Sequence, residues 1–119
     1  MATNLLRSDG KRPVTGDDIS LAITATVPAG VTLVKAWATF KSELGDSDAN
    51  AIAQVSTTSF SGTTTVTFTL VLSKTQTALF VAGRTYVWDV QAKDSNGNIG
   101  TVIPDGEVIW QKGATDTTT

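Results

Sequence analysis

Few side chains in this sequence carry the chemistry on which enzymes most often rely. The 119 residues include no histidine and no cysteine, so the commonest general base, the thiol nucleophile and the usual zinc ligands are absent. Two carboxylate pairs remain, Asp89 with Asp94 and Asp105 with Glu107, but their spacing indicates no surrounding aromatic cleft for acid/base work. Glycine-rich phosphate loops and a nucleophile-elbow serine are also missing. We therefore expect no catalytic residues, and we predict that the chain is not an enzyme.

One loop has part of the pattern of a metal site. Asp46, Asp48 and Asn50 occupy alternate positions, as in the first half of a calcium loop. The second half does not follow, because the sixth position is not glycine and the twelfth is Thr57. A polar turn explains this loop better, and hairpin-turn chemistry explains the oxygen-bearing side chains of residues 94–98. We predict no metal and no cofactor.

The elements that position these residues are strands, because apolar and polar residues alternate along most of the chain. We predict about seven strands, over residues 19–27, 31–41, 51–55, 62–72, 85–93, 99–103 and 107–111. The Ser73-x-x-Gln76 spacing of a capping box predicts one short helical turn between them. This pattern predicts an all-β fold, an immunoglobulin-like antiparallel β-sandwich of about seven strands, with a small closed barrel as the alternative.

A hairpin between residues 84 and 111 is the predicted centre of this fold. Its first strand alternates, so we expect Trp88 and Val90 in the core. Asn96-Gly97 is the pair that most easily takes positive φ at both central positions of a type I′ turn, which makes both residues structural. The return strand is expected to be broken at residues 104–106 and to resume afterwards.

Trp37 leaves two interpretations open. The alternation over residues 31–41 places it on a face that is otherwise polar. A one-residue bulge would turn Trp37 inward, as is usual for a tryptophan in the third-strand region of immunoglobulin-like sandwiches. Otherwise Trp37 is an exposed aromatic anchor of an interface.

The segment AGRTYVWDVQ at residues 82–91 resembles small immunoglobulin-like modules of bacteriophage virions. It is followed by Asp94, a glycine turn and a later Gly-x-Val strand. The N-terminal domain of phage baseplate upper proteins belongs to this group. Residues 36–41, 46–49 and 73–79 fit the same layout, so the resemblance covers most of the chain from about Ile19 onward. It implies that Tyr86 is structural, with its hydroxyl bonded to the backbone at a corner of the sandwich.

Composition limits the partners that we expect. The net charge is −2 and the nine lysines and arginines are scattered, so no basic stripe is available for nucleic acid. The absence of cysteine excludes disulfides and fits folding in a host bacterial cytoplasm. No apolar run has the length of a signal peptide or a membrane span. We expect neither nucleic acid nor membrane as a partner.

We divide the chain into an N-terminal arm (residues 1–18), the sandwich (19–113) and a polar tail (114–119). The arm is rich in glycine, proline and polar residues, so we expect it to add nothing to the core. It is either a frayed terminus or a segment that orders on a partner. The candidate contact residues within it are Leu5, Leu6, Arg7, Lys11 and Arg12.

Two classes of function fit these observations. The resemblance favours a non-enzymatic virion structural protein, docked on the capsid as a decoration or cement protein or on the tail or baseplate as an adaptor. Such a module would contact other virion proteins and form a homo-oligomer, for example a trimer. The alternative is a carbohydrate-binding or adhesive module that stacks sugars on Trp37 or Trp110. Burial of these two indoles would argue against that alternative.

Overall fold

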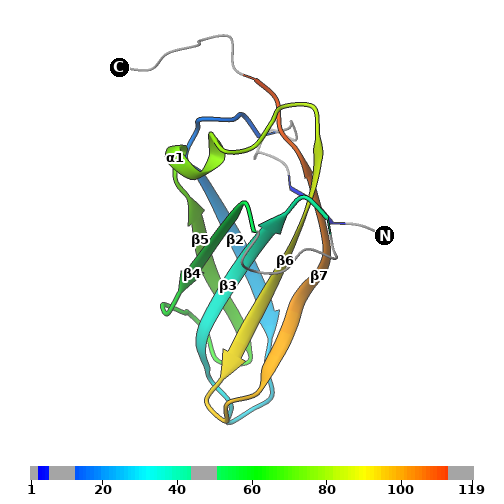
Figure 1. Ribbon diagram of the computed structural model, residues 1–119. Coiled ribbons are helices and arrows are strands. Elements are labelled where there is room, and N and C mark those ends of the chain that lie inside the picture. Colours follow the sequence, from blue (N-terminus) through cyan, green and yellow to red (C-terminus); the bar gives the residue numbers. More distant parts are fainter. Residues whose placement is uncertain (1–2, 6–12, 44–50, 113–119) are drawn as a thin grey trace.

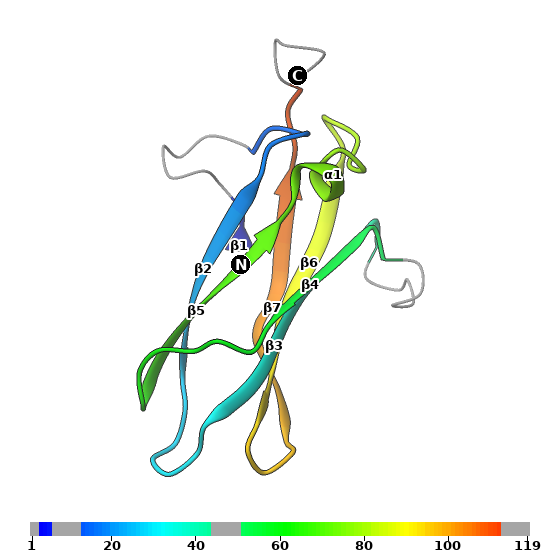
Figure 2. The same cartoon turned by 90° about the vertical axis from the view of Figure 1, so that its left-hand side faces the viewer.

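The computed structural model describes residues 3–5, 13–43 and 51–112 (Figure 1). It contains two β-sheets and one helical turn, so the predicted all-β sandwich is confirmed. Two layers of strands are visible when the molecule is seen from the side (Figure 2). The elements are β1 (Thr3–Asn4), β2 (Ile19–Thr26), β3 (Leu33–Lys41), β4 (Ala53–Thr57), β5 (Thr65–Leu72), α1 (Lys74–Thr77), β6 (Thr85–Asp94) and β7 (Ile99–Ile109).

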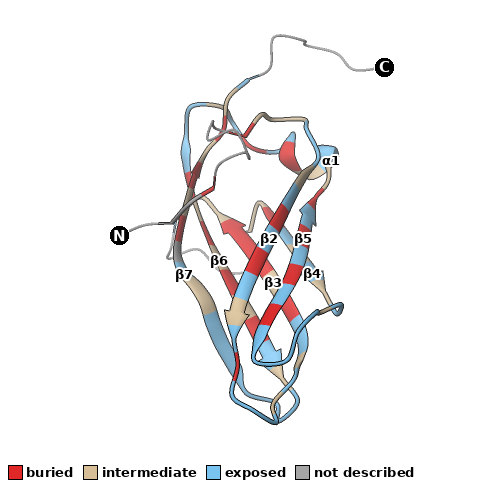
Figure 3. Cartoon of the chain, turned by 180° about the vertical axis from the view of Figure 1, so that it is seen from behind, coloured by how far each residue is buried: buried red, intermediate tan, exposed pale blue. Residues whose placement is uncertain are grey.

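The two sheets differ in size. The larger sheet has the strand order β1-β7-β6-β3-β4, and the smaller sheet pairs β2 with β5. Every pairing is antiparallel except that of β1 with β7. Alternate residues of each strand face the space between the sheets, as the red and blue bands of β2 and β5 show from behind (Figure 3). That space contains the hydrophobic core.

Aromatic rings fill the end of the core nearest α1. Phe40 stacks on Trp88 with ring centroids 5.8 Å apart, and Phe80 stacks on Trp110 at 4.6 Å. Tyr86 meets Phe80 edge to face at 4.9 Å. Trp88 is buried and Val90 is completely buried, as the alternation predicted.

Two predicted local contacts are confirmed at the same end. Gln76 N–H donates to Ser73 Oγ at 3.2 Å, and Ser73 N–H donates to Gln76 Oε1 at 3.0 Å, which completes the capping box of α1. The Tyr86 hydroxyl accepts a hydrogen bond of 2.8 Å from Val81 N–H. Tyr86 is therefore the structural corner residue that the resemblance implied.

The β6–β7 turn is a hairpin turn, but its predicted type was wrong. Gly97 has a φ of 86°, whereas no non-glycine residue described has positive φ, so Asn96 does not adopt the type I′ conformation. Gly97 N–H donates to Asp94 O at 3.0 Å, and Asp94 N–H donates to Asn98 O at 3.0 Å. These contacts define a type I turn followed by a left-handed glycine, the usual three-residue loop. Asp94 Oδ1 accepts bonds from the N–H groups of Asn96 and Asn98, and this carboxylate stabilises the longer turn.

The return strand is continuous, contrary to the predicted break at residues 104–106. β7 contains one more residue than β6 between the pairs Val90–Ile103 and Trp88–Gly106, so residues 104 and 105 form a bulge within one strand, directly before Gly106. The Trp88 indole lies against Gly106, where a Cβ would collide with it. Its Nε1 donates to the Glu107 carbonyl at 2.9 Å. The bulge therefore makes room for the largest side chain of β6.

The first part of the arm is a strand. β1 runs parallel to β7, with Thr3 opposite Gly106, and Leu5 N–H donates to Glu107 O at 3.0 Å. The Leu5 side chain is only 5% exposed and belongs to the core. The expectation that the arm adds nothing to the core is therefore wrong for these residues. The sequence pattern missed this strand because two paired residues are too few to show a period.

The last part of the arm is also fixed. Pro13 is fully buried, and Thr15 N–H donates to Gln111 O at 2.9 Å beyond the end of β7. Thr77 Oγ accepts a bond of 3.0 Å from Gly16 N–H and donates one of 2.7 Å to Asp17 O. This threonine joins the segment before β2 to α1, and it is completely buried.

Candidate docking surface

The outer face of the larger sheet contains the most distinctive surface of the described chain. Strand register places Lys35 opposite Lys93 and Trp37 between Gln91 and Ser56. Ile99, opposite Lys93 on β7, continues the surface with a side chain that is 59% exposed. We call this surface the tryptophan patch and define it by residues Lys35, Trp37, Ser56, Gln91, Lys93 and Ile99.

Trp37 lies on the outside of the sheet and is half-buried there. Its neighbours Ala36 and Ala38 are completely buried, so strand alternation directs Trp37 away from the core. A register shift does occur, but it lies between Leu33 and Lys35 and does not turn Trp37 inward. The interpretation of Trp37 as a core residue is therefore wrong.

The indole of Trp37 is held in one orientation. Its Nε1 donates to Gln91 Oε1 at 3.2 Å on the neighbouring strand. Lys35 Nζ lies 5.8 Å from the ring centroid, within the range of a cation–π contact. An aromatic side chain fixed in this way loses little conformational entropy on binding, as is typical of interface anchors.

The two lysines of the patch face each other across the β3–β6 pair. Lys35 and Lys93 are directly opposite in the β3–β6 register, and like charges in that position destabilise a sheet. Neither lysine forms an ion pair with a described carboxylate. The patch is therefore basic on a chain whose net charge is −2, and it would gain stability from an anionic group.

The patch surrounds a shallow cavity of about 370 Å³. Its lining combines an indole, two aliphatic residues, two ammonium groups and hydrogen-bonding side chains. The residues that line it are Lys35, Trp37, Gln54, Val55, Ser56, Lys93 and Ile99. This chemistry suits a carboxylate-bearing side chain with an apolar stem.

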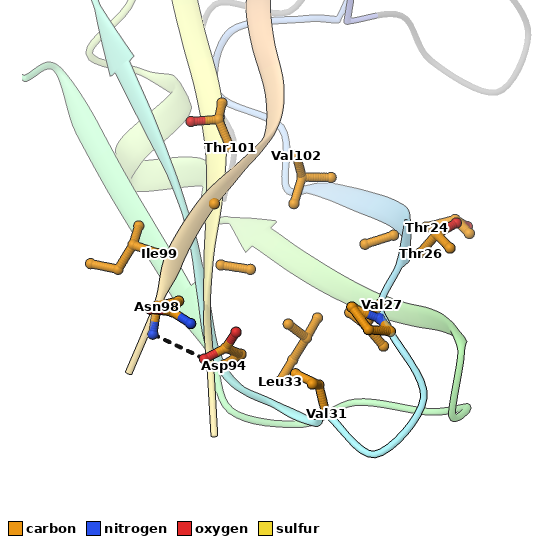
Figure 4. Close-up of a pocket in the computed structure, with 14 residues that line it drawn as sticks. Thr24, Thr26, Val27, Val31, Leu33, Asp94, Asn98, Ile99, Thr101 and Val102 are labelled. Carbon is orange, nitrogen blue, oxygen red and sulfur yellow. Dashed lines mark hydrogen bonds between the residues drawn. The ribbon is translucent and has the colours of Figure 1, made fainter. Parts of the chain in front are cut away.

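A second cavity of about 440 Å³ lies at the hairpin end of the sandwich (Figure 4). Val27, Leu33 and Val102 give it apolar walls, and threonines of β2 line its rim. Asp94 is the charged residue in its lining, but its Oδ1 accepts two hydrogen bonds from the β6–β7 turn. The cavity therefore presents less binding chemistry than the tryptophan patch.

The described residues hold no cluster of three or more histidine, cysteine, aspartate or glutamate side chains that would suit a metal ion. Asp89 lies on the outer sheet face, whereas Asp94 is part of the hairpin turn, so this candidate acid/base pair is not brought to a common cleft. The loop with Asp46, Asp48 and Asn50 lies outside the described residues. None of the described helical residues forms a helix with the length and hydrophobicity of a membrane span.

The predicted contact residues are not assembled into one site. Leu5 is in the core, and Trp37 is on the outer face of the larger sheet. Leu6, Arg7, Lys11 and Arg12 lie outside the described residues. Sequence reasoning missed Lys35 and Lys93 as site residues, because only the register between β3 and β6 makes them neighbours.

The comparisons with known proteins add no identification. The chain matches no protein-family model, no curated protein and no solved structure.

Proposed function

We propose that this chain is a non-enzymatic structural protein of a bacteriophage particle. It docks on the capsid as a decoration or cement protein, or on the tail or baseplate as an adaptor. The support for a phage particle is the sequence resemblance from about Ile19 onward, together with the immunoglobulin-like sandwich that this resemblance implied. Its partners are other virion proteins, and it reaches the virion after synthesis in the host bacterial cytoplasm.

The tryptophan patch is the observation that supports docking. Interface hot spots are enriched in tryptophan, surrounded by contacts that exclude water. Trp37 is an indole fixed on a sheet face, and the cavity beside it is lined by two lysines that form no ion pair with a described carboxylate. We assign the patch to an acidic surface of the neighbouring virion protein, because such a surface would relieve the repulsion between Lys35 and Lys93.

The place of the chain in the particle is tested by electron microscopy. Particles from the phage that encodes the chain should carry it in a regular arrangement on the head or on the tail. Antibody-gold labelling would give the same assignment at lower detail. Purified particles that contain none of this chain would contradict the proposed function.

The docking role of the patch is tested by charge reversal. Lys93→Glu should weaken rebinding to particles that lack the chain by about tenfold, because it places a carboxylate against an acidic partner. Lys74→Glu is the matched control, since Lys74 is exposed on α1 and lies away from the patch. Equal binding by both variants, with unchanged thermal unfolding, would remove the patch from the docking surface.

The carbohydrate-binding alternative rests on Trp37 alone. Trp110 is completely buried and stacked on Phe80, so it offers no platform for a sugar. The cavity beside Trp37 has a volume suited to one or two sugar rings. Titration with neutral and acidic saccharides tests this alternative, and saturable binding that Trp37→Ala abolishes would favour it over protein docking.

A further inference from the structure

β2 is an open edge of the smaller sheet. Its strand partner is β5, and no other described strand pairs with its opposite side. The open side lies along the flank of the molecule (Figure 2). The edge is eight residues long, which is longer than β4, the edge strand of the larger sheet.

The direction of the backbone groups along β2 follows from one hydrogen bond. Val27 N–H donates to Thr64 O at 2.8 Å, so the backbone groups of Val27 point toward β5. In an antiparallel pair every second residue does the same, which gives Ala25, Ile23 and Leu21. Thr67, opposite Thr24, exchanges both of its hydrogen bonds with Ser61 on the far side of β5, which agrees with this alternation. The backbone N–H and C=O groups that point to the open edge are those of Ser20, Ala22, Thr24 and Thr26.

The edge carries none of the features that prevent strand pairing. β2 contains no charged residue, proline or glycine, and its register with β5 has no bulge. Two other described edges are partly covered: β1 pairs with β7, residues 13–15 pair with Gln111 beyond the end of that strand, and Ser61 pairs with Thr67 on β5. β4, the edge strand on the other side of the larger sheet, is only five residues long. A long, uncharged and regular edge indicates that a further strand pairs with it.

We propose that β2 pairs with β2 of a second copy of this chain, antiparallel and about a two-fold axis, with Ile23 opposite Ile23. In this register Ser20 lies opposite Thr26 of the second copy, and Ala22 lies opposite Thr24. All four residues that point to the open edge therefore find partners. The two copies form one continuous sheet in the order β5-β2-β2-β5.

A second copy fits this edge because the edge is complementary to itself. A two-fold axis brings the same surface of each subunit together, and this strand brings no like charges into contact. Asp18, just before β2, lies opposite Pro28 of the second copy. On the exposed face, Ser20 meets Thr26, a hydroxyl pair of the kind that stabilises neighbouring strands. The pairing stands independently of a role in a virion.

Engineered disulfides test the pairing and its register. The chain has no cysteine, so any cross-link comes from introduced residues. Ser20→Cys with Thr26→Cys should give a covalent dimer on mild oxidation, because facing residues lie about 5.5 Å apart, within disulfide reach. Within one chain these positions are roughly 20 Å apart along the strand, so they cannot cross-link to each other. Ser20→Cys with Thr24→Cys is the control, and a covalent dimer of that variant instead would overturn the register.

A charge on the edge tests the interaction in solution. Thr24→Lys should raise the dimer dissociation constant, measured by analytical ultracentrifugation, by about tenfold or more. Thr69→Lys adds the same charge on the same sheet face, but on β5, so its dimer constant should stay within about twofold of the parent. Equal weakening by both variants, or a parent chain that stays monomeric at millimolar concentration, would overturn the proposal.

Amide exchange separates the second copy from other occupants of the edge. The N–H groups of Ser20, Ala22, Thr24 and Thr26 should become protected only at concentrations where the dimer forms, whereas those of Leu21, Ile23 and Ala25 should be protected throughout. Protection of both sets at every concentration would show that a segment of the same chain covers the edge. That result would overturn the proposed dimer.

Discussion

Trp88 and Gly106 depend on each other. The indole occupies space that a side chain at position 106 would fill, and its N–H bonds the carbonyl of the next residue of β7. This contact connects the central strand of the larger sheet to the bulge in β7. The bulge therefore accommodates the Trp88 indole, and substitution of either Trp88 or Gly106 should lower stability.

Truncation of the indole should be strongly destabilising. Trp88→Ala should lower the free energy of unfolding by about 3–5 kcal/mol, because it leaves a cavity beside Phe40. Chemical denaturation measures this change. A loss of less than about 1 kcal/mol would mean that Trp88 is not a principal core residue.

Addition of a methyl group to the bulge should also be destabilising. Gly106→Ala should lower the free energy of unfolding by about 1–3 kcal/mol, because the new Cβ meets the Trp88 indole and backbone. Gly100→Ala is the matched control on the same strand, where a Cβ would meet no atom within 4 Å. Denaturation of both variants should separate them, and similar stabilities would disprove the steric argument.

β1 contributes more than its two residues suggest. It covers part of the β7 edge and carries Leu5 into the core immediately after it. An edge covered in this way is protected against pairing with another chain, whereas β2 has no such cover among the described strands. The β7 flank of the sandwich should therefore resist pairing with another chain, whereas the β2 flank should allow it.

The contribution of this strand is tested at Leu5. Leu5→Ala should lower the free energy of unfolding by about 2–5 kcal/mol, because the side chain is buried. Leu79→Ala removes the same atoms from a side chain that is 59% exposed, and should change stability by less than about 0.5 kcal/mol. Thermal unfolding measures both, and an unchanged midpoint for Leu5→Ala would restore the view of residues 1–18 as a separate arm.

The whole molecule combines a β-sandwich with two distinct surfaces. The tryptophan patch is basic and aromatic, and it faces outward from the larger sheet. The open β2 edge is uncharged and belongs to the smaller sheet. The tryptophan patch is thus suited to an acidic surface of a different protein, and the β2 edge to the same strand of a second copy. The predicted homo-oligomer stays a prediction, and pairing through β2 would make it a dimer where the sequence suggested a trimer.

Salt should affect the two surfaces differently. Docking through the tryptophan patch should weaken several-fold as ionic strength rises from about 0.05 M to 0.5 M, because added salt screens the lysines. Association through β2 should change little, since it depends on backbone hydrogen bonds between uncharged strands. Binding to particles and sedimentation of the isolated chain over the same salt series measure the two effects. Salt-independent docking would argue against an acidic partner.

Local patterns in the sequence determined most of the secondary structure. Strand alternation predicted that Trp88 and Val90 are buried, and the Ser73–Gln76 spacing predicted the cap of α1. These features depend on residues close together in the chain, so they can be predicted without knowing which strands pair.

Tertiary structure decided the contacts between distant residues. The burial of Leu5, the meeting of Lys35 with Lys93 and the open edge of β2 each depend on which strands pair and in which register. Trp37 is the clearest example. Alternation placed it on the outer face, and a bulge next to it would have turned it inward. The register shift of β3 lies upstream, between Leu33 and Lys35, so Trp37 stays on the outer face. A shift of one residue in register reverses the direction of every side chain, and pairing between strands far apart in sequence sets that register.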